Sequence, residues 1–213
     1  MKNNHILKLA ASMLCLLLFT GVAYSQAGFG AKVGYVYSDV KVDVSEFDVD
    51  TKGKSDLSLG LFFELPLTQN FIIQPEFTYL GRGYKIVGNA LASDGTYNVA
   101  YVDVGAMAKL RFGDAIGFYI GAGPYFSYAV SGQFKNDQNE VDIDFDVDNY
   151  RRTDFTLGTA LGLEFGRRDA LRFFVDGRYL IGMNDLDDGD PITFSRHNRA
   201  FGVNGGIIIP LGQ

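Results

Sequence analysis

The sequence predicts an all-β protein: an eight-stranded antiparallel up-and-down transmembrane β-barrel with four long outer loops and three short turns at the other end. Apolar and polar residues alternate with period 2 in segment after segment beyond residue 25, which is typical of strands with two different faces. Long and short connections also alternate along the chain, as they do in membrane barrels. A soluble β-sandwich gives no reason for connection lengths to alternate in this way.

Residues 1–25 are predicted to be a secretory signal peptide that is removed, which leaves one domain over residues 26–213. A basic start is followed by a short apolar run, Leu9–Phe19, and by a small-residue cleavage site, Ala23–Ser25. The chain's single cysteine, Cys15, lies in the apolar run. The mature domain is therefore expected to have neither disulfides nor a cysteine-bound metal.

Eight segments show the period-2 alternation, and each is predicted to form one strand. They cover residues 29–38, 56–65, 71–80, 99–112, 116–130, 155–165, 171–181 and 201–211. Short turns are predicted at 66–70, 113–116 and 166–170. Long loops are predicted at about 39–55, 83–97, 132–152 and 183–198. The four loops then lie at one end of the barrel, and both chain termini lie at the other end with the turns.

The polarity of the two faces favours a membrane barrel over a soluble one. One face of each predicted strand is almost purely apolar, whereas the other mixes glycine, tyrosine and ionisable residues. Ten ionisable groups in the dry core of a soluble protein would be costly. A membrane barrel accommodates them in a polar, ion-paired interior, with lipid outside. Closure of the barrel gives every backbone N–H and C=O group a hydrogen-bond partner. The predicted interior polar cluster consists of Lys32, Glu64, Glu76, Asp103, Lys109, Arg111, Glu164, Arg172, Asp176 and Arg178.

Aromatic residues on the apolar faces gather near both ends of the predicted strands, as interfacial girdles do. Toward the loops these residues are Tyr37, Tyr79, Tyr128, Phe155, Tyr179 and Phe201. Toward the turns they are Phe63, Phe71, Phe112, Phe118, Phe165 and Phe173. A general preference of strands for aromatic residues explains their number but not this grouping.

Several stretches share glycine, aromatic and turn positions with a known family. They are 60–86, "YVDVGAMAKLRF" (101–112), "FYIGAGPYFSYAVSG" (118–132), 178–186 and 197–207. In these positions the chain resembles PorT-like or "porin family" outer-membrane β-barrel proteins, which are similar in layout to the small OmpX and OmpA barrels. The resemblance implies an outer-membrane location with the turns in the periplasm. The namesake of the family is associated with a protein-secretion system.

An acidic stretch, "EVDIDFDVDNY" (140–150), lies in the third predicted long loop, with aspartates at Asp142, Asp144, Asp146 and Asp148. An EF-hand loop counted from Asp142 would need glycine and glutamate where Val147 and Thr153 stand. Looser binding of divalent cations by these four aspartates and a specific acidic binding face stay open. The interpretation we favour is a solvated hairpin that turns near 136–139 and whose charges discourage aggregation.

Three functions are compatible with the sequence. The favoured one is a non-enzymatic outer-membrane protein whose acidic loops serve surface interaction, envelope integrity or a secretion apparatus. A narrow channel for small solutes is an alternative, because inward glycines leave room, although side chains usually fill an eight-stranded barrel. A lipid-modifying enzyme is a second alternative, in which His197 and Ser195, two residues apart on one strand face, form a base–nucleophile pair.

The balance of acidic and basic residues limits which classes of partner the protein is expected to bind. The chain has 25 acidic and 19 basic residues, and the predicted long loops carry the excess of acids. Nucleic acid is therefore not an expected partner, because an acidic surface repels phosphates. We expect a monomer surrounded by outer-membrane lipid, with envelope or secretion proteins as partners and with no cofactor.

Overall fold

The computed structural model of the chain describes residues 27–44, 51–86, 94–136, 139–145, 151–184 and 194–212. The predicted signal peptide lies outside these residues. The described residues form β1 (Gly28–Val44), β2 (Thr51–Pro66), β3 (Phe71–Ile86), β4 (Gly95–Phe112), β5 (Ile116–Asn136), β6 (Glu140–Asp142), β7 (Thr153–Phe165), β8 (Arg172–Gly182) and β9 (Phe194–Pro210). None of them belongs to a helix long and apolar enough to cross a membrane.

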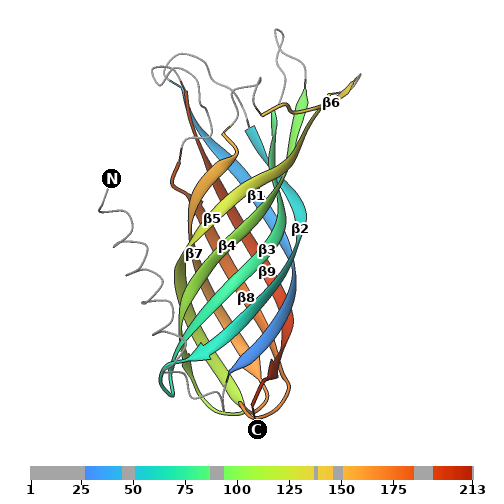
Figure 1. Ribbon diagram of the computed structural model, residues 1–213. Coiled ribbons are helices and arrows are strands. Elements are labelled where there is room, and N and C mark those ends of the chain that lie inside the picture. The colour runs from blue at the N-terminus through green and yellow to red at the C-terminus, as the bar shows by residue number, and fades with distance from the viewer. Residues whose placement is uncertain are drawn as a thin grey trace, which may run out of the picture.

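Eight of these strands form a closed antiparallel barrel (Figure 1). Each strand pairs with the next one along the chain, with β5 followed by β7, and β9 pairs back with β1 to close the sheet. The ninth, β6, is a three-residue addition to the loop end of β5. The predicted fold class, an eight-stranded up-and-down barrel, is confirmed.

The short turns and the ends of the described chain lie together at one end of the barrel (Figure 1). The amide of Leu211 donates to the carbonyl of Ala27 at 2.8 Å, which joins the two ends. Gly113 and Gly166 open two of the turns with φ of 93° and 119°, a region that residues with a side chain rarely adopt. These turn positions therefore require glycine.

The two faces of the barrel wall divide as the alternation predicts. In each strand of the barrel the outward-facing residues are mainly apolar and largely exposed, and the inward-facing residues are mainly buried. Aromatic residues lie side by side in rows at both levels. Near the loops Tyr37 lies opposite Phe201, and Phe201 lies opposite Tyr179. Near the turns Phe112 lies opposite Phe118. These rows fit the two predicted girdles, and the apolar band between them fits the interior of a bilayer.

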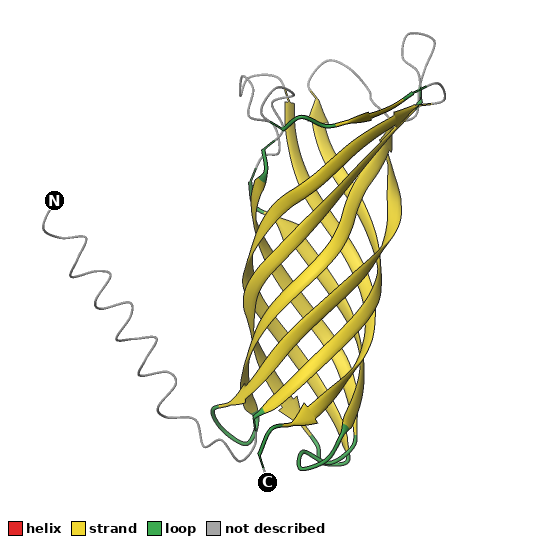
Figure 2. Cartoon of the chain, turned by 45° about the vertical axis from the view of Figure 1, so that its right-hand side comes forward, coloured by secondary structure: helices red, strands yellow, loops and turns green. Residues whose placement is uncertain are grey.

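Several strands run farther toward the loops than predicted (Figure 2). β3 continues to Ile86, β4 begins at Gly95 and β5 continues to Asn136, whereas the prediction placed these limits at 80, 99 and 130. The apolar–polar alternation fades beyond the girdle because the outer face of each strand meets water there and need not be apolar. The backbone hydrogen bonds between neighbouring strands continue where the alternation has faded, so part of each predicted loop forms strand.

A charge placed on the outer face tests the membrane orientation. Leu161 lies on β7 between Phe155 and Phe165 and is 54% exposed. We expect Leu161→Arg to lower the free energy of unfolding in lipid vesicles by about 2–4 kcal/mol, as arginine does at a bilayer midplane. Urea titration of the folded protein measures the change.

The matched control is Met183→Arg. Met183 is 62% exposed, and its amide donates to the carbonyl of Phe155 at the level of the loop-side girdle. There the cost should fall to about 0–1 kcal/mol. Equal costs at both positions would contradict a barrel that spans a membrane at this depth.

Candidate functional site

All ten residues of the predicted interior polar cluster lie inside the barrel and are buried. Two further charged residues, Arg82 and Asp154, are buried with them. Both follow the parity of their strands: Arg82 lies two residues beyond Leu80, and Asp154 two before Thr156. The prediction missed them because it ended one strand at 80 and began another at 155. The interior thus holds six bases and six acids among the described residues.

The charges nearest the turns form a lower cluster of Glu64, Lys109, Arg111, Glu164 and Arg172. Glu164 accepts from Lys109 Nζ, from Arg111 Nε at 2.7 Å and from Arg172 Nη1 at 2.8 Å. Glu64 accepts from Lys109 Nζ and from Arg172 Nη2, each at 2.6 Å. The two carboxylates therefore bridge four strands through three cations, and each carboxylate oxygen takes part.

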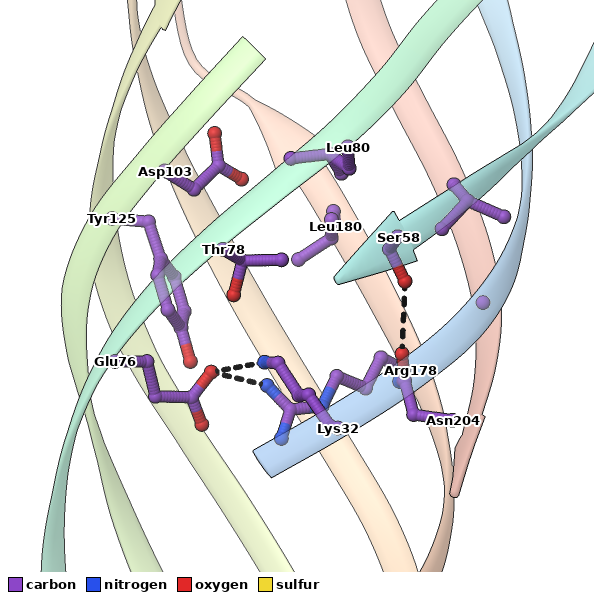
Figure 3. A pocket seen from close by; sticks show the side chains of 12 residues that line it. Lys32, Ser58, Glu76, Thr78, Leu80, Asp103, Tyr125, Arg178, Leu180 and Asn204 are labelled. Atoms are coloured by element: carbon purple, nitrogen blue, oxygen red, sulfur yellow. Dashed lines mark hydrogen bonds and ion pairs between the residues drawn. The ribbon is translucent and has the colours of Figure 1, made fainter. Parts of the chain in front are cut away.

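A central cluster lies above it, formed by Lys32, Glu76, Asp176 and Arg178. Figure 3 shows Glu76 Oε2 between Lys32 Nζ and Arg178 Nη1, each at 2.6 Å. Arg178 Nε also donates to Asp176 at 3.0 Å. Tyr119 Oη donates to Asp176 at 2.8 Å, so the Tyr119 side chain connects β5 to the central cluster.

A cavity of about 30 Å³ borders the central cluster (Figure 3). Its lining includes Lys32, Glu76, Asp103 and Arg178, and hence both signs of charge. Arg178 Nη2 and Asp103 Oδ1 are buried without a protein hydrogen-bond partner. The volume has room for about two water molecules, and these polar atoms would bind them.

A third polar layer lies nearer the loops. Arg82 Nη2 donates to Asp103 at 2.5 Å, and Arg82 Nη1 donates to Ser127 at 3.3 Å. Asp154 accepts from the amide of Asn184 at 3.2 Å and from Asn198 Nδ2 at 3.4 Å. Asp154 thereby ties the start of β7 to the end of β8 and to β9.

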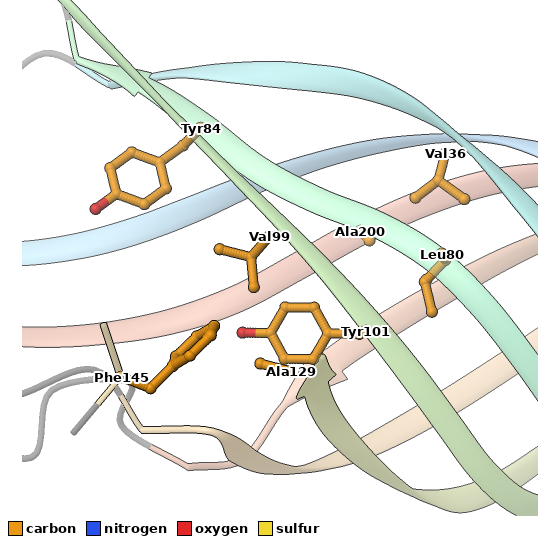
Figure 4. Packing of buried hydrophobic residues seen from close by; sticks show 8 residues of the cluster. All are labelled: Val36, Leu80, Tyr84, Val99, Tyr101, Ala129, Phe145 and Ala200. Carbon is orange, nitrogen blue, oxygen red and sulfur yellow. The ribbon is translucent and has the colours of Figure 1, made fainter. Parts of the chain in front are cut away.

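The loop end of the interior is apolar. A mouth cluster packs there, which Figure 4 shows, and consists of Val36, Leu80, Tyr84, Val99, Tyr101, Ala129, Phe145 and Ala200. Seven of these residues come from barrel strands, whereas Phe145 comes from the acidic stretch. Phe145 is 8% exposed, and the guanidinium of Arg152 lies 4.7 Å from its ring centroid. One residue of the third long connection thus packs against the apolar side chains at the barrel mouth.

The prediction for the acidic stretch is confirmed in part. β5 and β6 form a hairpin in which Gln133 pairs with Asp142 and Lys135 with Glu140, so that the chain turns at 136–139. Beyond Asp142, residues 143–145 do not continue the predicted solvated hairpin as a strand. The Ile143 amide still donates to the Gly132 carbonyl, and then Phe145 turns into the mouth, because burial removes its ring from water.

The candidate cation ligands are only partly described. Asp142 and Asp144 are exposed, and Asp142 accepts a hydrogen bond from Gln133 at 3.2 Å. Asp146 and Asp148 lie outside the described residues. In the described ranges, no three histidine, cysteine, aspartate or glutamate residues gather into a metal-binding group.

The candidate catalytic pair lies on β9. His197 is opposite Lys41 of β1, and Ser195 is opposite Asp43. The parity of β9 places His197 on the outward face with exposed Arg199, away from the interior clusters. The Ser195 side chain lies outside what the structure describes, so the pairing stays a prediction.

Glu164 provides a test of the lower cluster. Glu164→Gln keeps the shape but leaves three buried cations with one carboxylate. Breaking a buried ion pair costs about 3–5 kcal/mol, so the free energy of unfolding should fall by about that amount. Glu140→Gln is the control, because its 3.5 Å pair with Lys135 is exposed and should contribute under about 1 kcal/mol. Similar losses in both variants would argue against an interior held by ion pairs.

Phe145→Ala tests whether the Phe145 ring anchors its segment in the mouth cluster. Without its ring the segment 143–145 loses its buried anchor, so hydrogen exchange at the Ile143 amide should accelerate at least tenfold. The barrel strands should keep their protection. Val141→Ala, at a side chain that is 57% exposed, should leave exchange unchanged. An unchanged Ile143 rate in Phe145→Ala would show that the backbone bond to Gly132, rather than the ring, holds the segment.

Comparisons with known proteins agree with this architecture. The crystal structure of Neisserial surface protein A superposes with a TM-score of 0.51 at 13% identity, covering 87% of this chain and 97% of that one. OprG from Pseudomonas aeruginosa superposes with a TM-score of 0.55 at 11% identity, covering 89% and 97%. Identities this low show a shared fold alone. No curated protein matches the sequence at a significant level.

The sequence itself matches a family model. The model for the outer membrane protein beta-barrel domain covers residues 22–188, which include every strand of the barrel except β9. The family agrees with the apolar outer face, the girdles and the closed sheet, and it implies location in the outer membrane. The chain belongs to the family of outer-membrane β-barrel proteins.

Proposed function

We propose that this protein is a non-enzymatic outer-membrane barrel that acts through its acidic loop end. The role would be surface interaction, envelope integrity or assistance to a secretion apparatus. The observation that carries the proposal is the filled interior: three polar layers and the mouth cluster occupy the lumen, and the cavity beside the central cluster measures only about 30 Å³. A barrel filled in this way acts as a rigid support for what lies outside it.

The exposed groups at the loop end supply the chemistry of that surface. Asp94, Glu140, Asp142 and Asp144 are exposed there, as are Lys52, Lys85, Lys135 and Arg199. The excess of acids at this end comes from the sequence of the long connections as a whole. The resemblance to PorT-like proteins suggests a secretion-associated partner. An acidic surface favours a partner with a basic face, because opposite potentials steer association.

The two alternatives make different predictions. A narrow channel requires steady ion conductance through single folded barrels in a planar bilayer, and the proposal expects none. A lipid-modifying enzyme requires that lipid turnover by the folded protein be lost in His197→Ala. The proposal expects no turnover by either protein.

Replacement of the loop carboxylates tests the proposal directly. The variant Glu140→Gln, Asp142→Asn, Asp144→Asn removes three charges but keeps the side-chain shapes. In a deletion strain we expect it to restore neither detergent resistance nor the secreted-protein profile that the wild-type gene restores. The control Asp114→Asn, Asp169→Asn removes two exposed charges at the turn end and should restore both. Full complementation by the loop variant would refute an acidic functional surface.

A further inference from the structure

We infer that a lysine row on the outer wall, just beyond the loop-side girdle, binds the phosphate groups of a glycolipid in the outer leaflet. The lysine row consists of Lys52 on β2, Lys85 on β3 and Lys135 on β5, with Thr96 of β4 between the last two. Lys52 lies directly opposite Lys85, Lys85 opposite Thr96, and Thr96 opposite Lys135. The inference concerns the flank of the barrel and is independent of the acidic surface proposed above.

The lysine row faces away from the lumen. In the neighbouring row of the same strands, Tyr84 lies opposite Tyr97, and Tyr97 lies opposite Phe134. Tyr84 belongs to the mouth cluster (Figure 4) and Tyr97 packs against it, so this neighbouring row points inward. Successive side chains point to opposite faces of a strand, and the lysine row therefore points outward. All three lysines are exposed.

Two of the three lysines carry charges that no acid balances among the residues that the structure describes. Lys135 makes an exposed 3.5 Å ion pair with Glu140, whereas Lys52 and Lys85 have no such partner there. Lys52 and Lys85 instead face each other across β2 and β3, and like charges directly opposite each other destabilise a sheet. An anion held between them would remove this repulsion.

The outward face changes from polar to apolar between the lysine row and the girdle. Asn98 and Gln133 form an opposed pair on the membrane side of the row. Lys54 and Asp56 neutralise each other there at 2.7 Å, so neither adds net charge. Tyr79 of the girdle follows on β3, is 46% exposed and marks the start of the apolar band. An occupant that fits this order has anionic groups above the girdle and apolar chains below it.

A phosphorylated glycolipid has its chemical groups in this order. Its phosphates meet the ammonium groups of the lysine row, its sugar hydroxyls meet the amides of Asn98 and Gln133, and its acyl chains meet the apolar band. The long apolar stems of lysines can lie along the wall while their charged ends reach the phosphates. The loop end of an outer-membrane barrel faces the leaflet that holds such glycolipids. A soluble anion would leave the apolar part of this surface unused.

Native mass spectrometry of the detergent-purified protein with deep-rough lipopolysaccharide, before and after chemical removal of its phosphates, tests the inference. The wild type should bind the phosphorylated form at least tenfold more tightly. Lys52→Gln combined with Lys85→Gln should reduce binding of the phosphorylated form at least tenfold and leave binding of the dephosphorylated form unchanged. The charge-matched control is Arg167→Gln combined with Arg168→Gln, which removes two cations from the turn end and should bind as the wild type does.

Three further arms separate binding from folding and from free phosphate. Lys52→Arg combined with Lys85→Arg keeps both charges and should bind within twofold of the wild type. Without glycolipid, the glutamine variant should unfold at the same or a higher denaturant concentration, because it loses the repulsion. Inorganic phosphate at the concentration of the glycolipid should not displace it.

Four results would overturn the inference. They are equal binding of the two forms by the wild type, equal binding by the glutamine variant and the turn-end control, loss of binding in the arginine variant, and displacement by inorganic phosphate. A glutamine variant that unfolds more readily than the wild type would also overturn it, because the lysines would then have a structural role.

Discussion

The pairing of charge inside a wall that faces lipid is the constraint on which the rest of this structure depends. Glu164 and Glu76 each neutralise more than one cation, and Glu64 and Asp176 accept from further donors of the same cations. Because the partners of each carboxylate come from different strands, the ion pairs act across the barrel. A change in strand register would separate a buried cation from its acceptor, so the network favours one register over its alternatives.

On the inner face of the barrel wall, small residues lie beside large ones, so that the side chains fill the interior. Tyr119 packs across the position of Gly162, where an added Cβ would lie 2.5 Å from its ring. Phe62 lies over Gly30 in the same manner. Inward glycines therefore make room for large neighbours, as an eight-stranded barrel requires. The apolar mouth cluster completes the filling at the loop end, where ion pairs would be open to water.

Much of this arrangement could be predicted from residues alone. Period-2 alternation identified eight strands, and the polarity of their inner faces identified ten of the twelve charged residues that are buried among the described residues. Arg82 and Asp154 were missed because strand ends were placed where the apolar alternation fades, although the backbone ladder continues. The burial of Phe145 could not be predicted, because an aromatic residue among aspartates is equally consistent with an exposed hairpin. Its burial depends on the apolar mouth, which only the assembled barrel provides.

The most direct test of the account is the gel mobility of the detergent-purified protein, without the predicted signal peptide, compared before and after boiling. A closed barrel held by interior ion pairs should stay folded in the cold detergent and migrate faster, and boiling should convert it to the mobility of the unfolded chain. Identical mobility before and after boiling, in a protein that also dissolves in plain buffer, would contradict a closed, lipid-facing barrel.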